Sequence, residues 1–402
     1  MRKPAAVPPL HAYVHFPWCL EKCPYCDFVS FKTTRPAIDH EGYADAVIRE
    51  LRARAPFFAG HALRSLFFGG GTPSLWAPSS LGRVIDALRD SFPVTDDFEV
   101  TAECNPSSFD AEVVGGLSVA GVHRFSIGVQ SLDGAQLKHL GRLHGIEGAL
   151  ASVEAAVKSG ARVSADLIFG LPDQSAAEAA EHAGALVDLG LDHLSAYALT
   201  IEPGTRFGEL ARRGRLPLAT DDATCDAFLA VEAALAARGL EHYEVSNYAR
   251  PGQESRHNLG YWRGAAYIGL GCAAVGCGHF AGTPASAVRY RNDTDPARYV
   301  EKTRALALAE PSDADGLSLE HEHLDAETLL HERIMLGLRL AEGLDLAAAA
   351  VALGLSPDEV WSTRKATIER MSRDGDLVVE GTTLKVARDR RLRTDGLAAR
   401  LF

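Results

Sequence analysis

The sequence has no long apolar run and no excess of basic residues. None of its 402 residues belongs to an uninterrupted apolar span of about 18 residues, which argues against a membrane-spanning helix. The formal net charge is −12, so a phosphate-rich polyanion such as nucleic acid is an unfavourable partner. Residues 1–10 contain two basic residues and three prolines without an apolar core, so we expect no signal peptide. We therefore expect a cytoplasmic protein, with peripheral membrane contact left open.

Cysteine is scarce, but three of the seven cysteines form a CxxxCxxC motif at Cys19, Cys23 and Cys26. This distribution favours a reducing compartment over a disulfide framework. The motif follows the apolar run 12–16, so we expect it on the loop after a first strand. Four thiolates would complete a zinc or iron–sulfur site, whereas three leave one coordination position for a ligand that is not protein. The motif therefore predicts a reactive metal centre.

Apolar runs and helical patterns alternate through the first half of the chain. This alternation predicts a parallel sheet, and about six βα units favour an α/β fold of the partial (β/α)6 barrel type. In such barrels the functional side chains lie at the carboxyl ends of the strands. The predicted strands are 12–16, 64–68, 98–102, 124–129, 163–169 and 193–198, and the predicted helices are 43–54, 80–91, 110–119, 148–159 and 176–188.

Glycine and polar residues follow several of these predicted strands. The run 69–73, GGGTP, comes directly after the second strand and would let a ligand lie against bare backbone, although a plain glycine turn also explains it. Glu103 and Gln130 end the third and fourth strands, and Arg142 and Asp166 lie farther along. Each polar residue alone fits a surface ion pair or a strand cap. Together they predict a pocket for a polar ligand.

The cysteine motif and the glycine run resemble the radical S-adenosylmethionine (SAM) superfamily. The resemblance implies that the three cysteines hold a 4Fe-4S cluster and that the remaining iron binds the amino and carboxylate groups of SAM. Thiolates suit this role because they are soft anionic ligands for iron. The resemblance also implies that Gly70, Gly71 and Thr72 contact SAM, and that an electron from the cluster cleaves it.

Further residues resemble, in order and spacing, the SAM-contacting positions of the HemN-like branch of this superfamily. Within this set, Arg142 is suited to the SAM carboxylate and Asp166 to the ribose hydroxyls. The resemblance assigns SAM contacts to Tyr13, Glu103, Gln130, Arg142, Asp166, Ala198 and Val275.

Two features help to choose among the oxygen-independent coproporphyrinogen III oxidases, methyltransferases and HemW-type heme chaperones of that branch. The oxidases carry a fourth cysteine two residues after the triplet, where this chain has Phe28. The stretch 257–262, HNLGYW, resembles the heme-binding HNxxYW motif of the chaperones. The imidazole of His257 could ligate heme iron while the adjacent aromatic rings pack on the macrocycle. Taken alone, a hydrogen-bonded core histidine also explains this stretch.

A small second domain is predicted after a polar linker at 308–322. Its pattern resembles a winged helix, and the segment 335–340 resembles the opening of the C-terminal domain in the chaperones. The acidity of the chain argues against DNA binding. We interpret His321 and His323 as part of a solvated helix start. The predicted elements are helices at 326–340, 346–353 and 357–372, and two strands within 376–387 that meet at Gly381. The arginines that follow favour a solvated basic tail, and a local anion contact also explains them: Arg388, Arg390, Arg391 and Arg393.

We therefore predict a radical SAM barrel at 10–308 with a HemN-like extension, and a winged-helix-like domain at 320–402. The first hypothesis is a HemW-like heme chaperone that binds a 4Fe-4S cluster, SAM and heme and passes heme to an acceptor protein. Its cluster would need an electron donor. The alternative is a radical SAM enzyme, either a coproporphyrinogen oxidase or a methyltransferase. Phe28 and the HNLGYW stretch favour the first hypothesis.

Overall fold

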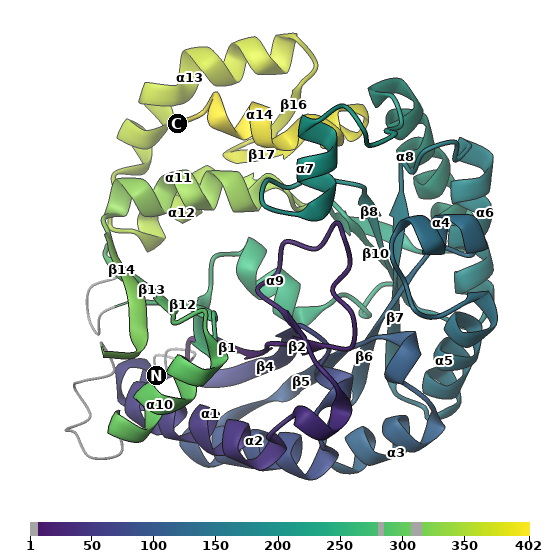
Figure 1. Ribbon diagram of the computed structural model, residues 1–402. Helices are drawn as coiled ribbons and strands as arrows, with labels where there is room; N and C mark the ends of the chain where they lie inside the picture. Colours follow the sequence, from purple (N-terminus) through teal and green to yellow (C-terminus); the bar gives the residue numbers. More distant parts are fainter. Residues whose placement is uncertain (1–6, 280–284, 307–315) are drawn as a thin grey trace.

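A curved sheet forms the centre of the computed structural model, which describes residues 7–279, 285–306 and 316–402. Within these residues the main sheet has 12 strands in the order β14-β13-β12-β11-β1-β4-β5-β6-β7-β8-β10-β9. Its middle is parallel and confirms the predicted partial (β/α)6 barrel (Figure 1). The six barrel strands are β1 (Pro9–Phe16), β4 (Ala62–Gly70), β5 (Val94–Cys104), β6 (Arg124–Gln130), β7 (Arg162–Phe169) and β8 (His193–Ala198).

The two faces of these strands differ in polarity because successive side chains point to opposite faces. In β1, Leu10, Ala12, Val14 and Phe16 are fully buried and belong to the main apolar core. The side chains that alternate with them are polar, and those of Tyr13 and His15 line a cavity. The outer face of the sheet therefore packs on helices, while its inner face presents polar groups to the centre of the barrel.

Helices cover the outer face of the curved sheet (Figure 1). Several begin where a side chain caps the first turn: Asp39 accepts from Gly42 N, Asp110 from Val113 N, and Ser175 from Glu178 N. No helix within the described ranges is both long and apolar enough to cross a membrane. The helices before the extension are α1 (His40–Arg54), α2 (Pro78–Ser91), α3 (Ala111–Val119), α4 (Gly134–His139), α5 (Ile146–Lys158), α6 (Ala176–Asp188), α7 (Arg206–Arg212) and α8 (Asp221–Ala236).

Strands that the sequence does not predict extend both edges of the barrel. The glycine-rich segment 267–276 belongs to a hairpin, because β11 pairs in parallel with β1 and then antiparallel with β12. Gly271 (φ 96°) and Ala273 (φ 61°) make the turn between these two strands. The added elements are β9 (Glu241–Glu244), β10 (Asn247–Ala249), α9 (Arg256–Trp262), β11 (Ala266–Leu270), β12 (Val275–His279), β13 (Ala287–Asn292), α10 (Pro296–Leu306) and β14 (Ser318–Leu324).

The predicted linker at 308–322 differs from the structure in its second half. Residues 307–315 lie outside the described residues, and Ser318–Leu324 forms strand β14 on the edge of the main sheet. His321 and His323 therefore lie opposite Tyr290 and Val288 of β13, not at a solvated helix start. Pairing with a distant strand has overridden the polar composition of this segment.

The C-terminal domain is winged-helix-like, as predicted, and has its own apolar core. The predicted solvated tail is wrong in part, because Arg388 and Arg391 contact the buried Glu232 of α8 at 2.9 and 3.2 Å. A hydrogen bond from Ala341 N to Tyr243 O (2.9 Å) also ties the domain to the barrel. Its elements are α11 (Ala326–Gly337), β15 (Leu344–Asp345), α12 (Leu346–Ala352), α13 (Pro357–Arg373), β16 (Leu377–Glu380), β17 (Thr383–Val386) and α14 (Thr394–Ala399).

Candidate cofactor and ligand cavities

The three cysteines of the motif lie on the loop that follows β1, where the sequence places them. All three are free and half-buried. The Thr72 hydroxyl donates to Cys19 Sγ at 3.4 Å, and Arg142 Nη1 donates to Cys23 Sγ at 3.4 Å. Burial raises the pKa of the Cys26 thiol to about 11. Burial also raises the pKa of Cys19, so without a cation Cys19 and Cys26 favour the thiol form, whereas a metal centre would favour the thiolate.

These cysteines border a small cavity of about 160 Å³, here called the cluster pocket. Among the described residues no three metal-ligating side chains converge on one point, as a single ion would require. Three thiols spread around a pocket instead fit a cluster in which each thiolate binds a different iron. Seven further predicted residues line the same pocket: Gly70, Gly71, Thr72, Glu103, Gln130, Arg142 and Asp166.

The glycine run packs directly against the cysteine loop. Gly71 N donates to Phe16 O at 2.7 Å, and Thr72 N donates to Trp18 O at 2.8 Å. A Cβ atom on Gly71 would meet the backbone of Phe16 and Trp18 at 2.6 to 2.8 Å, so no side chain fits there. Gly70 has a φ of 102°, which favours glycine. The run is therefore both a tight turn and one wall of the cluster pocket.

Two half-buried carboxylates, those of Glu103 and Asp166, line this pocket. Burial and the nearby Asp166 raise the pKa of Glu103 to about 8, and burial raises the pKa of Asp166 to about 6. Gly70 N and Ser126 Oγ donate to them at 3.0 and 3.2 Å. Neither carboxylate forms an ion pair within the described part of the chain, so the site favours a cationic ligand.

Arg142 and Gln130 also line the cluster pocket. Arg142 Nη2 donates to Gly128 O at 2.7 Å, while Arg142 Nε is buried and has no hydrogen-bond partner among the described residues. Gln130 ends β6 with a φ of 72°, a conformation that is uncommon for a residue with a side chain. Arg142 therefore has a donor available for a ligand carboxylate beside the cysteines.

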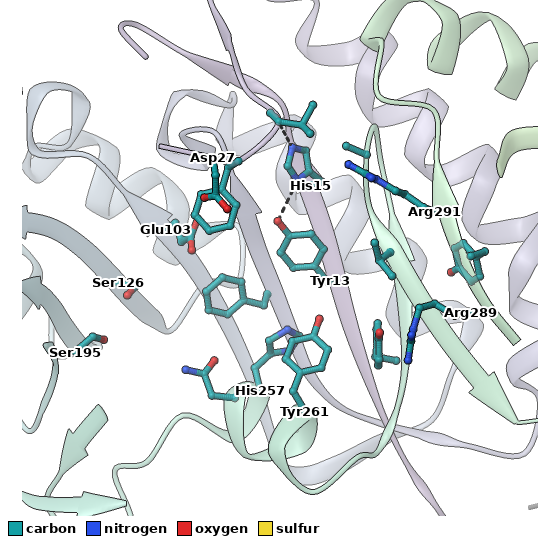
Figure 2. A pocket seen from close by; sticks show the side chains of 18 of the residues that line it. Tyr13, His15, Asp27, Glu103, Ser126, Ser195, His257, Tyr261, Arg289 and Arg291 are labelled. Atoms are coloured by element: carbon teal, nitrogen blue, oxygen red, sulfur yellow. Dashed lines mark hydrogen bonds between the residues drawn. The ribbon is translucent and has the colours of Figure 1, made fainter. Parts of the chain in front are cut away.

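A larger cavity of about 710 Å³, here called the barrel cavity, adjoins the cluster pocket. Phe28, Glu103, Ser126 and Asp166 line both, which makes them the boundary between the two spaces. In Figure 2, Glu103 and Ser126 lie on one side of the barrel cavity and Arg289 and Arg291 on the other. The predicted residues Tyr13, His257 and Val275 also line it. Ala198 ends β8 and lines neither space.

His257 begins the HNLGYW stretch on α9 and is 2% exposed. Its Nδ1 lies 2.8 Å from Ser65 Oγ, and its ring stacks on Phe67 with centroids 4.9 Å apart. His257 Nε2 is buried and has no hydrogen-bond partner among the described residues. Both interpretations of this histidine from the sequence thus have a structural counterpart: one nitrogen is held by the core, and the other is free to accept a ligand.

A third space, here called the interdomain cavity, has a volume of about 680 Å³ and lies between the barrel and α11 of the C-terminal domain. Asn258 and Tyr261 of α9 line both this cavity and the barrel cavity, whereas Trp262 lines only the interdomain cavity. Arg333 and Arg339 enter from the C-terminal domain. The sequence analysis did not predict this cavity, because domain docking brings its walls together from distant segments.

Family models match two segments of the chain. Residues 13–186 match the radical SAM superfamily, which covers the cysteine motif and most of the barrel. Residues 324–388 match the HemN C-terminal domain. The two matches correspond to the barrel and to the small domain seen in the structure.

The chain is also similar to curated and structurally solved proteins. It is 42% identical over 271 residues to the heme chaperone HemW of Escherichia coli, covering 67% of this chain and 70% of that protein. It is 35% identical over 346 residues to HemW of Mycobacterium tuberculosis, covering 86% of this chain and 85% of that protein. The structure of coproporphyrinogen III oxidase (HemN) from Escherichia coli matches with a TM-score of 0.78 and 22% identity, covering 98% of this chain and 90% of that one. At this identity, the match to HemN shows a shared fold.

Proposed function

Because this chain belongs to the HemW family of the radical SAM superfamily, we propose that it is a heme chaperone that binds a 4Fe-4S cluster, SAM and heme and delivers heme to an acceptor protein. The observation that carries the proposal is the series of three adjoining spaces in one molecule. A thiol-lined pocket adjoins a carboxylate-lined cavity, and that cavity shares α9 with a third space that has aromatic and arginine walls. These linings match the chemistry of a cluster, a sulfonium ligand and a porphyrin in turn.

In this proposal Cys19, Cys23 and Cys26 hold the cluster through their thiolates, and the bound cluster supplies an electron for SAM cleavage. Glu103 attracts the positively charged part of SAM. The unpartnered Nε of Arg142 is a donor available to the SAM carboxylate. The bare backbone of the glycine run lets SAM approach closely. Burial of these groups strengthens each interaction because water does not screen them.

For heme, the proposal assigns the HNLGYW stretch to the wall of the binding site. Tyr261 and Trp262 can pack on the macrocycle from the interdomain cavity. His257 lies next to Tyr261 on α9, with ring centroids 4.7 Å apart, and its hydrogen bond with Ser65 anchors the helix. We therefore assign His257 to the heme site as the residue that holds α9 in place, with Nε2 as a further nitrogen available to iron once the aromatic cover opens.

The remaining partners follow from this chemistry. A cluster that cleaves SAM needs a reducing electron donor, and a chaperone needs a heme-accepting protein. Half-buried free thiols next to the cluster pocket are suited to the reducing cytoplasm, where we place the protein.

The second candidate function, an oxygen-independent coproporphyrinogen III oxidase, is favoured only by the shared fold with HemN. To decide between the two, the cluster-reconstituted protein is incubated anaerobically with reductant and SAM. One sample also receives coproporphyrinogen III, and the other receives hemin and an apo-hemoprotein as acceptor. The proposal predicts transfer of heme to the acceptor without formation of protoporphyrinogen. Clear conversion of coproporphyrinogen III without heme transfer would overturn it.

A further inference from the structure

The interdomain cavity contains half-buried positive charge that the fold neutralises only in part. Arg333 on α11 and Arg339 just beyond its end both line the cavity, and both come from the C-terminal domain. A buried cation is costly unless an anion or several acceptors surround it. The surroundings of these two arginines therefore indicate which ligand the cavity accepts.

Arg333 is the less satisfied of the two. Its Nη1 donates to the carbonyl oxygen of Arg263, and no carboxylate within the described residues forms an ion pair with it. Burial lowers its pKa, the direction expected of a guanidinium whose charge is poorly compensated. A side chain on Gly264 (φ 61°) would collide with the guanidinium, so the glycine makes room for it. The group is thus held against the cavity wall with donors to spare.

Arg339 is partly satisfied. Its Nη2 lies 2.5 Å from the carboxylate of Asp395, a residue that is largely exposed. Its Nε is buried and lacks a partner in the described structure. The guanidinium carbon lies 5.2 Å from the centre of the Trp262 ring, in a cation–π contact. Arg339 thus links the positive side of the cavity to the aromatic side.

The acidic residues of the cavity are already engaged elsewhere. Glu332 binds Arg289 through both carboxylate oxygens, at 2.5 and 2.6 Å. Glu244 accepts hydrogen bonds from Asn247 and from Ser246 N, and burial raises its pKa to about 7. Glu332 still raises the pKa of Arg333 by its charge, but neither carboxylate forms an ion pair with Arg333. The uncompensated charge of the cavity is positive.

The rest of the wall is aromatic and apolar. Tyr261, Trp262 and Tyr267 contribute rings, and Leu329, Met335 and Leu336 contribute aliphatic surface. A wall of this kind favours a flat apolar ligand, and the two arginines favour a ligand with anionic groups at one edge. Heme has this combination, with a planar macrocycle and two carboxylates on the same edge.

We propose that heme lies in the interdomain cavity with its two carboxylates bound by Arg333 and Arg339, an inference that rests on the proposed chaperone function. The small domain then supplies the anion-binding half of the site, and α9 of the barrel supplies the aromatic half. Affinity for heme accordingly depends on the free carboxylates of the ligand as well as on its macrocycle.

The test compares hemin with hemin dimethyl ester, in which both carboxylates are blocked. Dissociation constants are measured from the Soret band for the full-length protein and for the double variant Arg333→Leu/Arg339→Leu. The wild type is expected to bind hemin at least about tenfold more tightly than the ester, because a hydrogen bond to a charged group is worth about 1.5 to 3 kcal/mol. The double variant is expected to lose this preference. Its dissociation constants for both ligands should equal that of the wild type for the ester.

Two further variants exclude a trivial loss of structure. Arg333→Lys keeps the charge and is expected to retain part of the preference for hemin. Arg373→Leu removes an exposed arginine of α13 and is expected to leave both constants unchanged. SAM binding by every variant reports correct folding, since SAM is assigned to a different space.

Equal affinity of the wild type for hemin and its ester would overturn the assignment of Arg333 and Arg339 while leaving the chaperone function intact. The same holds if the folded double variant still prefers hemin. Failure of the wild type to bind either ligand would instead contradict the chaperone function itself.

Discussion

The carboxylates of the cluster pocket and the arginines of the interdomain cavity contribute unpaired charge of opposite sign. In the cluster pocket, Glu103 and Asp166 are half-buried carboxylates without an ion-pair partner in the described structure, and Arg142 adds one guanidinium beside Cys23. In the interdomain cavity, Arg333 is a half-buried guanidinium without an ion-pair partner among the described residues. One region therefore favours a cation such as the sulfonium and ammonium of SAM, and the other favours an anion such as the carboxylates of heme.

This contrast teaches how one chain can keep two ligands apart. The barrel cavity lies between the two regions and shares residues with each. Opposite charge at its two ends makes each ligand unfavourable in the other's place, because exchange would bury like charges together. Separation by charge also makes the two sites testable one at a time.

The largest expected effect is that of Cys19→Ala. Removal of one of three thiolates is expected to reduce iron and sulfide content to near background after reconstitution, with loss of the visible absorbance of the cluster. Hemin binding should persist, since the interdomain cavity contains none of the three cysteines. Cys225→Ala, at an exposed cysteine of α8, is the matched control and should keep its cluster. An intact cluster in Cys19→Ala would contradict the assignment.

Next in size is the effect of Glu103→Gln on SAM binding. Glutamine cannot ionise when a cation binds, whereas the Glu103 carboxyl, with its pKa raised to about 8, can. SAM is therefore expected to bind more weakly by about 1.5 to 3 kcal/mol, or roughly tenfold or more, as measured by anaerobic calorimetry. Glu112→Gln, at an exposed carboxylate of α3, serves as the control with no expected change. Equal loss of SAM and hemin affinity in Glu103→Gln would contradict the assignment of the two ligands to separate regions.

A smaller effect concerns the pH dependence of stability. Glu103 has a pKa of about 8 in the ligand-free fold, against 4.5 ordinarily, so the folded state binds its proton more tightly than the unfolded state does. The stability that this group contributes is complete below about pH 4.5 and is lost as the pH rises through 8. Thermal melting of the ligand-free protein should therefore show Glu103→Gln to be more stabilising at pH 9 than at pH 5. A gain in melting temperature of Glu103→Gln over the wild type that shrinks as the pH rises would contradict this prediction.

The smallest expected effect is that of Thr72→Val. The Thr72 hydroxyl donates to Cys19 Sγ at 3.4 Å, and a hydrogen bond to a ligating sulfur raises the reduction potential of a cluster. The variant should keep its iron content and show a slightly more negative midpoint potential in an anaerobic redox titration. Thr33→Val, at the edge of the same loop, should leave the potential unchanged. A shift in the positive direction would exclude this hydrogen bond as the cause.

The barrel and the cluster pocket could be predicted from the sequence because their signals are local. Each barrel strand is a short β-favouring run between helices, and the polar residues at strand ends share one edge of a parallel sheet. The topology alone then brings Gly70, Glu103, Arg142 and Asp166 to the cysteine loop.

The hairpin β11–β12 and the interdomain cavity could not be predicted in the same way. Strand β12 has the sequence VGCGH, which has the composition of a loop and becomes a strand through pairing with β11 and β13. Trp262 and Arg333 lie 71 positions apart, and only the docking of the small domain places them in one cavity. Trp262 belongs to the HNLGYW stretch that resembles a heme-binding motif, whereas no local pattern marks Arg333 as part of a ligand site.

The most direct test of heme binding is an anaerobic titration of the cluster-reconstituted protein with hemin, with saturating SAM present and His257→Ala run in parallel. Because SAM and heme are assigned to separate regions, hemin should bind even when SAM is saturating, and its Soret band should reach a plateau. His257→Ala should bind hemin more weakly, because loss of the contact with Ser65 frees α9. Absence of saturable binding by the wild type would contradict the chaperone function and leave HNLGYW as a structural element of a radical SAM enzyme.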